Sequence, residues 1–123
     1  MTFSKTKETK INMKKTEIKI NITLDEENIP ENITWNATQK PSDAPENSKA
    51  VSVALWDDTT MNCLRVDLWT KDMTIEEMKR FFVNNLGGMA QTILNATGDE
   101  FMATETNLLC DRLVEHLKKE NTK

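Results

Sequence analysis

The sequence has few of the residues from which catalytic and metal centres are built. Its 123 residues include one histidine, two cysteines and three glycines, and they contain no glycine-rich phosphate-binding loop. His116 lies among charged residues near the C-terminus, which favours a surface position over a role as a general base. Cys63 and Cys110 match no common zinc-ligand spacing, so we expect free thiols in the core. We therefore expect neither an enzyme nor a cofactor or metal site.

Long apolar runs and excess positive charge are also missing. No segment approaches the roughly 18 apolar residues that span a bilayer, and no secretory signal is visible, so we expect a cytoplasmic protein without stable membrane insertion. The net charge of −4 argues against nucleic acid as a partner. Residues 1–15 are lysine-rich without hydrophobic period, which predicts a disordered basic tail, and Met13 is an alternative start.

Alternating apolar residues predict four strands, beginning at residue 16. The apolar positions of these strands are Ile18, Ile20, Ile22 and Leu24, then Ile33, Trp35 and Ala37, then Val51, Val53 and Leu55, then Leu64, Val66 and Leu68. A short turn near residues 57–60 joins the last two into an antiparallel hairpin, with Val53 opposite Leu64 and Val51 opposite Val66. Acidic residues at 25–27 and 57–58 are interpreted as turns rather than acid–base pairs.

The hydrophobic period then changes to that of a helix. Thr74 and Glu77 form a capping box that opens the first helix, and Gly87-Gly88 within it indicates a kink or a close backbone contact. The pattern breaks near residues 95–99, and a second amphipathic helix follows. This order predicts an α+β fold over residues 16–120, a four-stranded antiparallel sheet followed by two amphipathic helices packed on one face.

The predicted hairpin offers the one candidate binding surface. Trp56, Arg65, Asp67 and Trp69 share the face opposite the apolar row, and Cys63 lies among them. Tryptophan and arginine are enriched at binding hot spots, so this face is suited to anchor a protein partner. Cover by the N-terminal segment or by the chain's own helices explains the same residues equally well.

The run LWDDTTMNCLRVDLWTKDMTIEEMKRFF resembles the gliding motility-associated GldC family, most strongly in LRVDLWTKDM at residues 64–73. The opening TEIKINITLDEENIPENITWNAT is also similar, so the resemblance covers about residues 16–117. It implies a small cytoplasmic protein that supports bacterial surface gliding together with other gliding proteins. The resemblance carries no assigned catalytic or binding residues, so it transfers none.

Two functions remain open from the sequence. The first is a non-catalytic accessory or adaptor protein that acts through protein contacts. The second is a small-ligand or chaperone-like binding protein with a pocket between sheet and helices, where Gly87-Gly88 would permit a close approach. A homodimer paired through an edge strand is compatible with either function.

Overall fold

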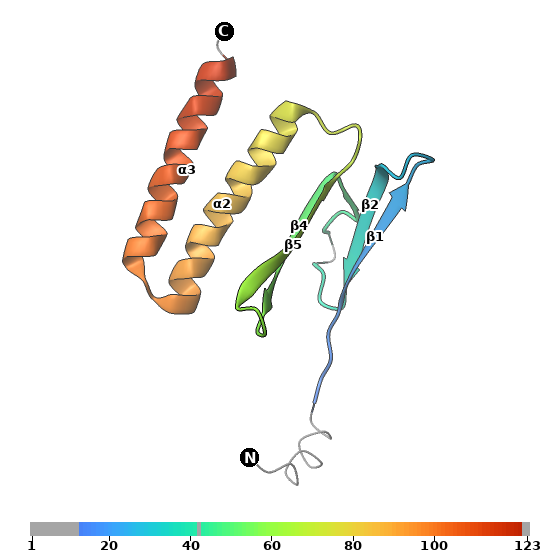
Figure 1. Cartoon of the computed structure of the whole chain (residues 1–123), viewed down its shortest axis with the longest axis horizontal. Coiled ribbons are helices and arrows are strands. Elements are labelled where there is room, and N and C mark those ends of the chain that lie inside the picture. Colours follow the sequence, from blue (N-terminus) through green and yellow to red (C-terminus); the bar gives the residue numbers. More distant parts are fainter. Residues whose placement is uncertain (1–12, 42, 122–123) are drawn as a thin grey trace. The chain divides into compact units, whose positions relative to one another are not determined.

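The computed structural model describes residues 13–41 and 43–121, and its elements follow the order β1, β2, β3, β4, β5, α2, α3 (Figure 1). By internal contacts the chain divides into two compact units, Met1–Asp72 and Met73–Lys123. Most of the predicted basic tail, residues 1–12, lies outside the described residues. The α+β class and the antiparallel pairing of the strands are confirmed, but the strands form two small sheets instead of one.

The first sheet contains three antiparallel strands, β1 (Ile18–Leu24), β2 (Pro30–Ala37) and β3 (Asn47–Ser48). Ile20 pairs with Trp35 and Ile22 with Ile33, so the alternating apolar residues of β1 and β2 lie on one face. The turn between them is held by Asp25, whose Oδ1 accepts from the backbone N–H groups of residues 27 and 29 at 2.8 and 3.0 Å. The interpretation of residues 25–27 as a turn is confirmed.

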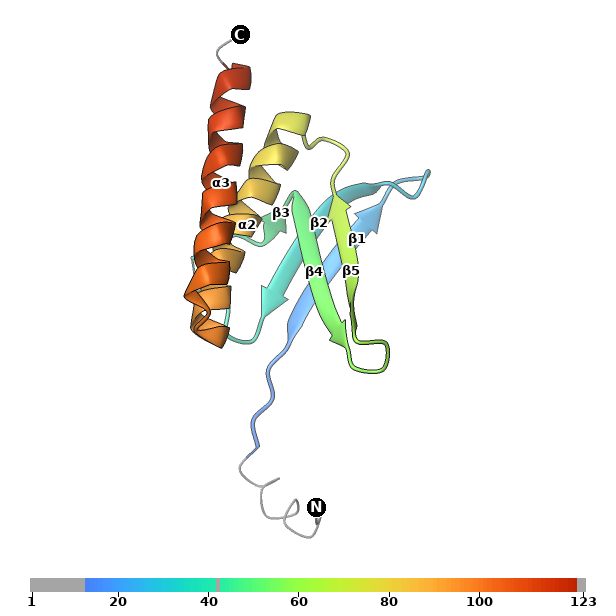
Figure 2. The same ribbon diagram turned by 60° about the vertical axis from the view of Figure 1, so that its left-hand side comes forward.

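The second sheet is the hairpin of β4 (Ala50–Asp57) and β5 (Asn62–Trp69), which Figure 2 shows ending in a tight turn. Val53 pairs with Val66 and Leu55 with Leu64, so the predicted register is wrong by two residues. Asp57 still belongs to β4, so the turn lies at residues 58–61, one residue later than predicted. The Asp57 carboxylate accepts a hydrogen bond from Thr60 Oγ1 in this turn at 2.5 Å. Because side chains alternate with period two, this shift leaves the predicted faces intact.

A short strand explains why the four predicted strands do not form one sheet. β3 returns from the loop after β2 and pairs with Ile33 and Thr34, so it occupies the edge of β2 that β4 would need. The sheets are instead linked at one end, where Lys71 N–H, two residues after β5, donates to the Pro30 carbonyl of β2 at 2.9 Å.

Within the strand unit, burial is concentrated where the two sheets meet. Ile33 is 1 % exposed, and among the described residues it is the largest fully buried side chain. In the hairpin, Val51 and Val53 are half-buried, whereas the apolar side chains farther out are mostly exposed, at 61 % for Leu55, 57 % for Leu64 and 52 % for Val66. The row predicted to be dry is therefore dry only at the base of the hairpin.

The second unit is a helical hairpin of α2 (Ile75–Thr97) and α3 (Glu100–Asn121). The predicted capping box is confirmed, since Thr74 Oγ1 accepts from Glu77 N–H at 3.1 Å and Glu77 Oε1 accepts from Thr74 N–H at 3.0 Å. The predicted break is also confirmed, because Gly98 ends α2 in the left-handed region at φ 72°. Packing of this hairpin on a face of a sheet stays a prediction.

Small residues form the contact between the two helices. Val83 and Ala90 of α2 and Ala103 of α3 are the buried residues of this unit. The predicted kink or close backbone contact at Gly87-Gly88 is not found, because α2 continues through both glycines and a Cβ at Gly87 would meet Cys110 Sγ only at an ordinary distance of 3.5 Å. Lys79 of α2 reaches across to Glu120 of α3 at 3.0 Å, which ties the open ends of the hairpin together.

The difference in burial along β1 and β2 makes a testable prediction. Replacement Ile33→Ala should lower the free energy of unfolding by about 2–5 kcal/mol, because it leaves a cavity where the sheets meet. Ile18→Ala makes the same change on the same sheet face at a side chain that is 72 % exposed, and should cost less than about 1 kcal/mol. Urea unfolding followed by circular dichroism measures both, and equal losses would contradict this assignment of the core.

Candidate functional site

The described residues contain no group of three or more His, Cys, Asp or Glu side chains that could hold a metal ion. His116 is confirmed as a surface residue, with a side chain 62 % exposed whose Nε2 lies 3.4 Å from a Glu120 carboxylate oxygen. Both cysteines are free thiols as predicted, but Cys63 is exposed and so its prediction as a core residue is wrong. Cys110 is half-buried, and its Sγ lies 3.5 Å from the Val83 carbonyl.

The four predicted binding residues do lie on one face of the β4–β5 hairpin. The register pairs Trp56 with Cys63, Ser52 with Asp67, and Trp69 with Ala50, which places the two tryptophans at opposite ends of the same face. Trp69 pairs with Ala50, which is six positions from Trp56 in β4, so the two tryptophans lie about 20 Å apart along the strand. We call Trp56, Arg65, Asp67 and Trp69 the tryptophan face.

The two tryptophans are exposed, at 61 % for Trp56 and 45 % for Trp69. The third tryptophan differs, since Trp35 in β2 is half-buried and the Lys40 ammonium lies 4.6 Å from its ring centroid. Within the described part of the strand unit, no residue covers these two indoles. These two side chains are thus available in the described structure for contact with another molecule.

Arg65 and Asp67 form a bidentate pair between the tryptophans. Arg65 Nε donates to Asp67 Oδ2 at 3.1 Å, and one terminal nitrogen of Arg65 donates to Asp67 Oδ1 at 2.9 Å and to Ser52 Oγ at 2.7 Å. Ser52 Oγ donates in turn to Asp67 Oδ1 at 2.5 Å. The hydrogen bonds from Arg65 and then Ser52 lower the pKa of Asp67, and the Asp67 hydrogen bond raises the pKa of Arg65.

This network determines what the tryptophan face offers chemically. The guanidinium is held along the strands by a neighbouring carboxylate, so it presents a positioned polar group instead of a net positive charge. The face thus combines two exposed indoles with a polar group held in place between them.

Sequence reasoning missed that the opposite face is exposed as well. Leu55, Leu64 and Val66 project from the other side of the same hairpin, each more than half exposed. Alternation predicts which residues share a face, but nothing in it indicates where the covering layer ends. Within the strand unit, the far half of the hairpin therefore carries apolar side chains on both faces.

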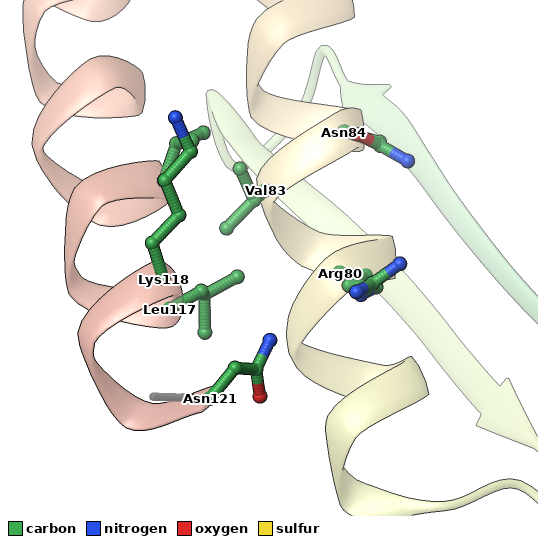
Figure 3. Close-up of a pocket in the computed structure, with 7 residues that line it drawn as sticks. Arg80, Val83, Asn84, Leu117, Lys118 and Asn121 are labelled. Atoms are coloured by element: carbon green, nitrogen blue, oxygen red, sulfur yellow. The ribbon is translucent and has the colours of Figure 1, made fainter. Parts of the chain in front are cut away.

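Of the pockets within the units, two are mainly apolar. The first, with a cavity volume of about 280 Å³, lies between α2 and α3, where Val83 and Leu117 point into the space between the helices and Arg80, Asn84, Lys118 and Asn121 surround it (Figure 3). The second, of about 210 Å³, lies in the strand unit and is lined by Ile18, Ile20, Ile33, Trp35, Ser48 and Val51. Both are smaller than the roughly 300–1,000 Å³ typical of small-molecule sites.

The Arg65–Asp67 pair predicts the titration of one carboxyl group. An NMR pH titration should place the Asp67 pKa below the ordinary value of 3.8, and Arg65→Leu should move it upward. Because the pKa of Asp67 is lower in the folded state, the pair stabilises the folded protein at pH values above 3.8. This stabilisation is lost as the pH falls through the folded-state pKa of Asp67. Asp57, whose pKa is lowered by Thr60 instead, is the control and should not move. An unchanged Asp67 midpoint in the variant would contradict the pairing.

Comparison with known proteins identifies the family. A family model described as gliding motility-associated protein GldC-like matches residues 30–119, which include β2, the tryptophan face and most of both helices. Neither a curated protein nor a solved structure matches the chain. None of the helices among the described residues is long and apolar enough to cross a membrane. The match covers well over half of the sequence and confirms the resemblance seen at residues 64–73: the chain belongs to the GldC-like family of gliding motility-associated proteins.

Proposed function

We propose that this protein is a non-catalytic cytoplasmic accessory or adaptor of the gliding machinery, and that it binds another gliding-motility protein through the tryptophan face. Membership of the GldC-like family supports the part of the proposal that concerns gliding motility. The exposure of Trp56 and Trp69 on either side of the Arg65–Asp67 pair is the observation that carries the molecular part.

The structure of the face favours binding on physical grounds. Tryptophan has two side-chain torsions and a large apolar ring, so it loses little conformational entropy for the area it buries. Arg65 is already held by Asp67 and Ser52, so its ordering does not oppose association. The matching partner is a protein surface with apolar hollows for the indoles and a hydrogen-bonding group opposite Arg65.

A small-ligand or chaperone-like binding protein is the second candidate. It is supported by the apolar pocket that Ile33, Trp35 and Val51 line between the two sheets. A volume of about 210 Å³ accommodates only a small apolar group. Protein contact therefore explains more of the exposed apolar surface than ligand binding does.

The proposal is tested in gliding cells with matched variants of one hairpin. Replacing Arg65 and Trp69 together by alanine should weaken capture of gliding proteins by about 30-fold or more and reduce gliding, since hot-spot truncations cost about 2 kcal/mol or more. The control replaces Leu55 and Leu64 by alanine on the opposite face. In-cell crosslinking followed by mass spectrometry compares the captured proteins at equal expression.

Identical captured proteins from the tryptophan-face variant and the wild type would overturn the proposal. Loss of capture confined to the Leu55/Leu64 variant would overturn it as well, because the contact would then lie on the other side of the hairpin. Circular dichroism of both purified variants shows whether each remains folded.

A further inference from the structure

The side of α3 that faces away from α2 carries an apolar and charged stripe, which no residue of the helical unit covers. Phe101, Glu105, Leu108 and Arg112 follow the i, i+4, i+7, i+11 spacing and so share one helix face. Phe101 is 73 % exposed and Leu108 is 51 % exposed. We call these four residues the α3 outer stripe.

The outer stripe points away from α2. The helix contact is made by Ala103, which is buried, and by Cys110, which lies against Gly87. Phe101 and Leu108 each precede one of these contact residues by two positions, which is about 200° around the helix. The pairing of α2 with α3 therefore does not bury the stripe.

The charges of the stripe have no partners within the described residues. Neither Glu105 nor Arg112 forms an ion pair with another described side chain, whereas farther along α3 His116 pairs with Glu120 and Lys118 with Glu115. On one helix the two are seven residues or about 10 Å apart along the axis, too far to pair with each other. The stripe thus presents one negative and one positive charge on either side of an exposed leucine.

We propose that this stripe binds a second copy of the chain, with the two α3 helices antiparallel across a two-fold axis beside Leu108 and Leu109. Glu105 and Arg112 are equally distant in sequence from that point, so the two-fold axis places Glu105 of each copy opposite Arg112 of the other. Two equivalent ion pairs then enclose a centre made by the leucines of both copies.

The order of Glu105 and Arg112 along α3 favours the antiparallel pairing of the two helices over a parallel one. In a parallel pairing Glu105 would face Glu105 and Arg112 would face Arg112, so both contacts would be repulsive. With 22 residues and a rise of 1.5 Å per residue, α3 is about 33 Å long, and both ion pairs fall well within this length. Phe101 and Leu108 would lose their exposed apolar surface to the partner helix, which supplies the attraction.

Charge reversal tests the proposal directly. Sedimentation velocity over a range of concentrations should show a dimer for the wild type. Glu105→Arg and Arg112→Glu should each weaken it by about tenfold or more, because each places like charges opposite one another twice. The double variant exchanges the two charges and should recover the wild-type dimer. Asp111→Arg, an equal charge change about a quarter turn away on the helix, is the control and should dimerise normally.

Mixing the two single variants provides a second readout. Glu105→Arg chains carry two arginines in the stripe and Arg112→Glu chains carry two glutamates, so neither pairs with itself but the mixture should form a heterodimer. A wild type that stays monomeric at every concentration would overturn the proposal, as would single variants that dimerise as well as the wild type. Normal helix content by circular dichroism excludes misfolding, and tryptophan-face variants should not alter the dimer.

Discussion

The meeting of the two sheets around Ile33 is the constraint on which the rest of the strand unit depends. β3 occupies the edge of β2, so the β4–β5 hairpin cannot extend the first sheet and is attached only at its base. Apolar burial stabilises that base, where Val51 and Val53 are half-buried. Within the strand unit, the first sheet therefore does not reach the outer half of the hairpin, where Trp56 is exposed.

The sequence was informative wherever local chemistry decided the structure. Alternation located the four main strands and their faces, and the capping box at Thr74 and the break at Gly98 marked where α2 begins and ends. The register of the hairpin was missed by two residues because period-two alternation is unchanged by such a shift. β3 was missed because two residues show no period at all, and with it the division into two sheets was missed.

The candidate site was predictable in composition but not in environment. The strand pattern correctly placed Trp56, Arg65, Asp67 and Trp69 together. The hydrogen bonds that join Ser52 to Arg65 and Asp67 depend on cross-strand register, which the sequence does not determine. The exposure of Leu55 and Leu64 on the opposite face depends on which other segment packs against them, and strand alternation does not indicate this. Family membership, the exposed hairpin and the outer stripe of α3 together describe a protein whose available surfaces are suited to contact other proteins.

The exposure of the tryptophan face is the central claim, and one measurement on the unmodified protein tests it. A soluble paramagnetic agent relaxes protons according to their access to solvent, and the chain has three indole N–H signals, one from each tryptophan. The account predicts strong relaxation of the Trp56 and Trp69 signals and much weaker relaxation of the Trp35 signal. Protection of Trp56 and Trp69 equal to that of Trp35 would contradict it.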